Sequence, residues 1–233
     1  MFTPLPWWRW LCILAVFFGG HMVFFSQILH WLFLRVWPAY RLYSLALQAS
    51  LLSVISTIIT ALILFWLSLP LWKNEVQNSK RNWLEVIQWV LISFGLYFVG
   101  TVLLSLITAR ATGNNNQSLI TVYFAVNPLG MTFCATLIGP FCEEIVFRAA
   151  LGSQFFKNHP LFGILTSSIL FALMHIYTIF FTGQWGQLVN FLPYFYTGFL
   201  LVVLYKQTGT LTASLILHML INILAVSNMI GWF

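Results

Sequence analysis

The sequence predicts an all-α fold, a polytopic transmembrane helical bundle with a polar site within the bilayer. Of its 233 residues, 61% are hydrophobic and only 6% are charged, whereas soluble domains use about 25% charged residues. Apolar stretches of about 20 residues, long enough to cross a bilayer as helices, recur along the chain. Because the connections between them are short, we expect residues 1–233 to form a single integral membrane domain with about seven spans.

The first three spans are predicted over residues 11–34, 42–69 and 86–108. The first is too long for the apolar core of a signal peptide and is interpreted as an uncleaved span. Pro38 favours a turn after it, and Pro70 is expected to end the second span, because proline lacks the backbone N–H that a helix interior needs. Residues 73–85 then form a charged loop expected at the lipid headgroups.

The remaining spans are predicted over residues 128–152, 161–181, 187–205 and 211–230. Before them, residues 110–118 are interpreted as an Asn-rich turn, and residues 119–126 are apolar but too short to cross a bilayer. Asn127 is expected to cap the next helix, with Pro128 in its first turn, where the missing N–H does no harm. We expect no further domain and no repeat.

The distribution of positive charge predicts the orientation in the membrane. A cytoplasmic N-terminus places six cations inside, namely Arg9, Lys73, Lys80, Arg81, Lys157 and Lys206. It places three outside, namely Arg35, Arg41 and Arg110. This bias follows the positive-inside rule. We therefore expect a multi-pass protein of the cell membrane, in contact with membrane lipid, whose scattered cations do not indicate a nucleic-acid partner.

One stretch of the chain, Gly139 to Arg148, concentrates charge inside an apolar run. It reads GPFCEEIVFR and holds two of the four acidic residues of the chain. Charges at membrane depth are costly unless they face a polar cavity or one another, so this cluster is a functional-site hypothesis. Within the same helix, Pro140 is expected to free the carbonyl of Thr136 and to bend the helix just before Glu143.

Helical phase separates the two glutamates of this stretch. Glu144 and Arg148 are four residues apart and share a face, so they can form a supporting ion pair. Glu143 points roughly 100° away from Glu144. We therefore expect Glu143 to face a cavity, where it can act as a general base.

Two later spans contribute polar residues at comparable depth. His218 and Asn222 share a helical face, and at 1.5 Å per residue His218 and Glu143 each lie about 12–13 Å from one end of their spans. His175 comes out deeper, at about 22 Å. Glu143 and His175 could hold and deprotonate a water molecule while His218 and Asn222 donate hydrogen bonds to an oxyanion. Equally, Glu143, His175 and His218 could bind a divalent metal ion such as zinc.

The motifs Glu143-Glu144-x-x-x-Arg148, Phe171-x-x-x-His175 and His218-x-x-x-Asn222 resemble the CPBP family of intramembrane proteases. That family includes CAAX-processing endopeptidases of the Rce1 type and bacterial Abi proteins. The resemblance covers residues 128–226. It implies an intramembrane endopeptidase, of bacterial origin, that cleaves a prenylated CAAX-like peptide, a peptide precursor or a membrane peptide. It also implies that the catalytic residues are Glu143, His175, His218 and Asn222, supported by Glu144 and Arg148.

Two other function classes remain open from the sequence. One is a non-catalytic membrane protein that confers immunity against a peptide toxin such as a bacteriocin, or that acts as a scaffold. Protection that survives loss of Glu143 and His175 would favour it. The other is a small transporter that uses the buried carboxylates as a proton relay, suggested by the interruption expected at Pro193 and the bend at Pro140.

Overall fold

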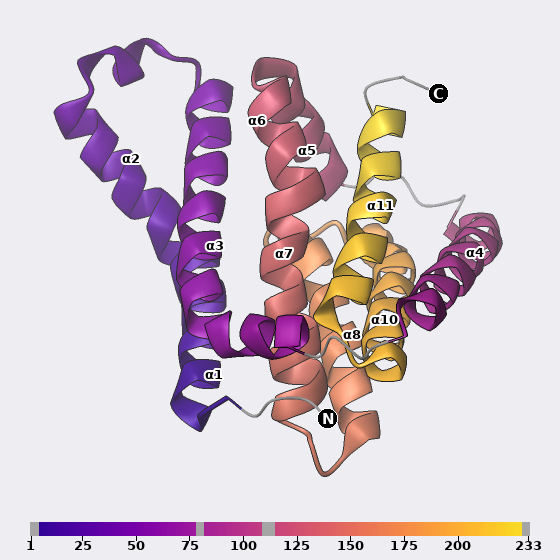
Figure 1. Cartoon of the computed structure of the whole chain (residues 1–233). Coiled ribbons are helices and arrows are strands. Elements are labelled where there is room, and N and C mark those ends of the chain that lie inside the picture. Colours follow the sequence, from indigo (N-terminus) through magenta and orange to yellow (C-terminus); the bar gives the residue numbers. More distant parts are fainter. Residues whose placement is uncertain (1–4, 78–81, 109–114, 230–233) are drawn as a thin grey trace.

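The computed structural model describes residues 5–77, 82–108 and 115–229, and in these ranges it consists of helices joined by short turns, without any strand (Figure 1). The α-helices are α1 (Trp7–Leu14), α2 (Phe25–Val36), α3 (Leu45–Gln77), α4 (Trp83–Thr108), α5 (Asn115–Val126), α6 (Pro128–Phe133), α7 (Gly139–Glu143), α8 (Pro160–Ile176), α9 (Thr178–Thr182), α10 (Phe191–Thr208) and α11 (Leu211–Met229). Three segments are π-helical, η1 (Ala15–Phe24), η3 (Cys134–Ile138) and η4 (Glu144–Gln154), and two are 3₁₀-helical, η2 (Pro38–Leu42) and η5 (Trp185–Asn190).

The described residues contain six helical segments long and apolar enough to cross a membrane, and α8 is a shorter apolar helix of 17 residues. The six are Trp7–Val36, Leu45–Glu75, Trp83–Leu106, Pro128–Gln154, Trp185–Thr208 and Leu211–Met229. Several elements join into one span, for example α6, η3, α7 and η4 in the fourth. The prediction of a polytopic all-α membrane bundle is confirmed.

The prediction that Pro70 ends the second span is wrong, because α3 continues through it to Gln77. Contacts on the far side of the proline compensate for the lost hydrogen bond. Trp72 stacks on Phe141 with ring centroids 5.6 Å apart, and its indole N–H donates to Ser68. The last turns of α3 run across the foot of the bundle (Figure 1), as expected for a helix kinked at proline.

Three other predicted boundaries also change. Residues 115–118, expected in a turn, belong to helix α5, whereas residues 109–114 lie outside the described range. The span predicted over residues 161–181 divides at Tyr177 into α8 and α9. Pro193 does not interrupt its span, since it lies in the first turn of α10, where a helix needs no N–H donor.

The fourth span lies at the centre of the bundle, with α7 between α3 and α11 (Figure 1). It begins as predicted, with Pro128 in the first turn and the Asn127 side chain accepting a hydrogen bond from the Gly130 N–H at 3.2 Å. Every residue from Glu144 to Ser153 is buried. The polar residues between Glu144 and Ser153 are therefore enclosed by neighbouring helices and shielded from lipid.

Long-range hydrogen bonds tie the helices together at the foot of the bundle. Arg9, on α1, donates to the carbonyl of Leu67, on α3, at 3.1 Å. Glu75, near the end of α3, accepts from the Thr210 and Thr212 hydroxyls at 2.8 and 2.7 Å. The turn between η4 and α8 and the end of α10 lie at this same end (Figure 1). Among the cations used for orientation, Lys80, Arg81 and Arg110 lie outside the described residues.

Candidate active site

The centre of the site is a fully buried ion pair that also holds a histidine. Glu144 and Arg148 are both 0% exposed, and Nη2 of Arg148 lies 3.2 Å from Oε1 of Glu144. The same oxygen accepts a hydrogen bond from Nδ1 of His218, on α11, at 2.8 Å. Buried charges need partners of this kind, because desolvation costs several kcal/mol per ion. The pairing of Glu144 with Arg148 is confirmed.

This arrangement also orients the imidazole of His218. A carboxylate oxygen can only accept, so Nδ1 of His218 carries the proton that reaches Glu144. The opposite nitrogen, Nε2, faces Glu143 and lies 3.7 Å from its Oε2. That separation is longer than a hydrogen bond. Oε2 of Glu143 is buried and has no hydrogen-bond partner among the described residues, so the two adjacent glutamates stand in different environments, as their helical phase predicts.

Phe171 joins the charged cluster to the second histidine. Its ring lies 4.6 Å beneath the Arg148 guanidinium, a cation–π arrangement worth about 0.5–2 kcal/mol. Its centroid is 4.4 Å from that of His175 and 5.7 Å from that of His218. Although the sequence places His175 deeper than His218, the two imidazoles therefore contact one ring. The sequence analysis named Phe171 only as part of the motif that ends at His175 and assigned it no role.

His175 is held by its own helix and by α10. Its Nδ1 lies 2.8 Å from the carbonyl oxygen of Phe171, which leaves Nε2 as the nitrogen that can accept a proton or hold water. The ring stacks on Tyr194 with centroids 4.4 Å apart. His175 also interacts electrostatically with Glu143. The sequence analysis did not identify Tyr194 and considered only the neighbouring Pro193.

Asn222 binds the backbone of the central span. Its Nδ2 donates to the Ala135 carbonyl at 2.8 Å. Pro140 was expected to free the carbonyl of Thr136, and the carbonyl that Asn222 binds is that of the preceding residue, Ala135. In η3 the bonds are π-helical, as the Gly139 N–H bonds the carbonyl five residues before it. Five residues after Ala135 comes Pro140, which has no N–H, so the Ala135 carbonyl is the one left for Asn222.

Residues 125–224 match the family described as type II CAAX prenyl endopeptidase Rce1-like. The resemblance to the CAAX-processing proteases is confirmed. The matched region contains the glutamates, both histidines and Asn222, whereas the first three spans lie outside it.

Two curated relatives are similar over longer stretches, of 137 and 161 residues. The UPF0177 protein YvdC of Lactococcus lactis is 28% identical over 58% of this chain and 49% of its own length. The membrane-embedded CAAX protease MroQ of Staphylococcus aureus is 27% identical over 64% of this chain and 59% of its own length. The chain thus spans about half to three-fifths of the length of these relatives. No solved structure matches the chain.

The Rce1-like region does not assemble a metal site in this arrangement. Within the described ranges, no three side chains of His, Cys, Asp or Glu are grouped closely enough to hold a metal ion. The predicted ligands Glu143, His175 and His218 are chemically suitable for zinc. However, Nδ1 of each histidine is already hydrogen-bonded, so each could offer only Nε2.

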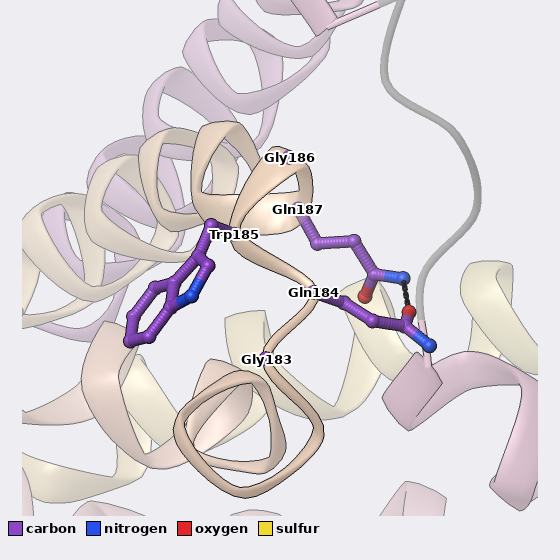
Figure 2. A pocket seen from close by; sticks show the side chains of 5 residues that line it. All are labelled: Gly183, Gln184, Trp185, Gly186 and Gln187. Atoms are coloured by element: carbon purple, nitrogen blue, oxygen red, sulfur yellow. Dashed lines mark hydrogen bonds between the residues drawn. The ribbon is translucent and has the colours of Figure 1, made fainter.

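A surface pocket of about 400 Å³ lies apart from these residues, in the turn between α9 and η5 (Figure 2). The indole of Trp185 stands on one side, and the hydrogen-bonded amides of Gln184 and Gln187 stand on the other. Gly183 closes the turn with a left-handed backbone, φ 68°. None of the predicted site residues lines this pocket.

Proposed function

We propose that this chain is an intramembrane endopeptidase, with Glu143, His175, His218 and Asn222 as its catalytic residues. The observation that carries the proposal is the carboxylate oxygen of Glu143, which is buried, lacks a hydrogen-bond partner among the described residues and faces Nε2 of His218. A carboxylate with one buried, unpaired oxygen beside oriented imidazoles can serve as a general base. The match of residues 125–224 to a protease family also supports an endopeptidase function.

In the proposed reaction, Glu143 and Nε2 of His175 hold one water molecule against the carbonyl carbon of the substrate. The water oxygen forms the new C–O bond as its proton moves to Glu143, giving a tetrahedral intermediate. Glu143 then returns the proton to the amide nitrogen, and the C–N bond breaks. No step needs a redox partner or a second substrate.

His218 and Asn222 are proposed to stabilise the oxyanion. Asn222 uses one N–H of its amide on Ala135, which leaves the second N–H for the substrate. A His218 ring that carries both protons would donate from Nδ1 to Glu144 and from Nε2 into the site. Glu144 and Arg148 would then act as support, because they fix the ring at 2.8 Å from Oε1. A single donor of this kind contributes about 10²–10³ in kcat.

The proposal is tested with purified protein in liposomes and an internally quenched peptide that ends in a farnesylated CAAX tail. Glu143→Gln should abolish cleavage, with the product identified by mass spectrometry. Glu85→Gln is the matched control, because Glu85 lies in the first turn of α4, outside the site, and should leave the rate unchanged. Undiminished cleavage by Glu143→Gln would refute the proposal.

Two parallel measurements address the cofactor and the substrate class. Elemental analysis of the purified protein, combined with a chelator added to the cleavage assay, decides whether zinc takes part. An unprenylated copy of the CAAX peptide and a single-span membrane peptide, assayed beside the farnesylated one, distinguish a prenylated substrate from a peptide precursor or a membrane peptide.

We also propose that the protein lies in a bacterial cell membrane with its N-terminus in the cytoplasm. The relatives YvdC and MroQ come from bacteria. Helix α1, which carries Arg9, begins at the end of the bundle where α3 ends (Figure 1), which agrees with the positive-inside distribution. Labelling a cysteine placed at Arg9 and another placed at Arg41 with an impermeant reagent in intact cells tests the orientation, since only Arg41→Cys should react.

A further inference from the structure

The first span, which lies outside the Rce1-like region, packs against the helix that carries the glutamates. The ring of Phe17, on η1, meets the ring of Phe147, on η4, edge to face with centroids 5.8 Å apart. One turn further along η1, the ring of His21 lies 5.7 Å from that of Phe17. A histidine is therefore present in the layer beside the site.

The chain directions bring His21 to the level of Glu143. The first span runs up from the foot of the bundle, whereas the fourth span runs down toward it (Figure 1). His21 lies four residues after Phe17, and Glu143 lies four residues before Phe147. Because the two helices are antiparallel, both steps lead in the same direction from the Phe17–Phe147 contact. His21 and Glu143 also interact electrostatically.

Each of these residues has a buried atom without a hydrogen-bond partner among the described residues. They are Nδ1 of His21 and Oε2 of Glu143. Buried polar atoms are rarely unpaired in folded proteins, and an ordered water molecule commonly bridges two of them. His21 also sits in a π-helical segment, a form that is frequent at functional sites.

We propose that His21 is a further catalytic residue, which binds the reacting water through Nδ1 while Glu143 binds the same water through Oε2. This inference rests on the proposed protease function and adds a first-span residue to it. His21 holds the water and stays neutral throughout. The proton still passes from the water to Glu143 and then to the leaving amine. Glu143 and Nε2 of His175 accept the two hydrogens of this water, and the N–H at Nδ1 of His21 donates to one lone pair of its oxygen. The second lone pair is then directed at the substrate carbonyl.

Three variants of the full chain test this assignment in liposomes with the farnesylated CAAX peptide. His21→Phe keeps a ring but removes both nitrogens, and should lower kcat about ten-fold or more with little change in KM. His21→Asn places an amide where Nδ1 stood, and should restore most of kcat. His30→Phe is the matched control in the same span, because His30 bonds the Tyr40 hydroxyl at 2.9 Å, outside the site.

A second readout needs no cleavage. The infrared band of the Glu143 carboxylate, located by subtracting the spectrum of Glu143→Gln, should shift in His21→Phe and stay unchanged in His30→Phe. If the wild type cleaves no peptide but the Glu143 band shifts in His21→Phe, the protease proposal fails, whereas the water shared by His21 and Glu143 is supported. If His21→Phe leaves the band unchanged, or if His21→Asn is as slow as His21→Phe, the assignment of His21 is overturned.

Discussion

Removing Arg148 should strongly destabilise the protein, because it would leave the carboxylate of Glu144 buried without its cation. Both side chains are 0% exposed and lie 3.2 Å apart. Arg148→Met keeps the length of the side chain and its contact with Phe171 but removes the charge. Breaking a buried pair on one side costs about 3–5 kcal/mol, so the free energy of unfolding should fall by about 3 kcal/mol.

The double variant Glu144→Gln, Arg148→Met separates charge from packing. It removes both charges and keeps a side-chain oxygen that can accept from His218. Among the described residues, none of the three guanidinium nitrogens of Arg148 has a hydrogen-bond partner, and its ion-pair partner is Glu144, at 3.2 Å. The double variant should recover at least half of the lost stability, since paired removal is often near neutral.

Unfolding by sodium dodecyl sulfate in mixed micelles, followed through the fluorescence of the 11 tryptophans, measures both variants. Cleavage of the farnesylated peptide is measured in parallel, and both should be slow because His218 loses part of its support. If Arg148→Met is as stable as the double variant, the unpaired carboxylate is not what destabilises the protein, and the reasoning is refuted.

Three further changes test how the helices are held. Glu75→Ala should lower the free energy of unfolding by about 1–3 kcal/mol, since it removes a carboxylate that caps the first turn of α11. In the same unfolding assay, the stability of Glu75→Gln should lie between those of Glu75→Ala and the wild type. Gly163→Ala places a Cβ 2.5 Å from a backbone oxygen of η4 and should cost about 1–3 kcal/mol, whereas Gly95→Ala, with nothing within 4 Å, should be neutral or stabilising. Asn222→Leu leaves the Ala135 carbonyl unpaired, at about 1–3 kcal/mol, and should abolish cleavage; full activity would exclude the oxyanion role.

The sequence was sufficient to predict the helices and the local pairing within them. Apolar stretches of spanning length leave the chain no alternative to helices in lipid, because every backbone group must be satisfied internally. The pairing of Glu144 with Arg148 follows from a spacing of four residues. By contrast, the hydrogen bond from His218 to Glu144 joins residues 74 positions apart. The sequence predicts that His218 lies at the depth of the two glutamates, but it does not predict which glutamate His218 bonds.

The prolines show why boundaries were harder to predict than helices. Pro70 and Pro193 lack the same N–H, yet one lies inside α3 and the other in the first turn of α10. The outcome at Pro70 depends on what packs beyond it, including the stacking of Trp72 on Phe141, and no local pattern contains that information. At Pro193 the deciding fact is where the helix begins, and the mixed polar and apolar residues before it do not define that point.

The π-helical segments explain why Asn222 binds the carbonyl of Ala135, and they connect this bond to the site. All three border the cluster, since η1 carries His21, η3 presents the Ala135 carbonyl to Asn222, and η4 begins at Glu144. Hydrophobic periodicity cannot reveal such a turn where every face is apolar. Its effect is nevertheless large, because one additional residue in a turn rotates all later side chains by about 100°. If the span were a regular α-helix from Pro128 onward, the two glutamates would point about 100° away from their present directions relative to Ala135. The π-helical turn of η3 therefore allows Asn222 to bind Ala135 while Glu144, and not Glu143, receives His218.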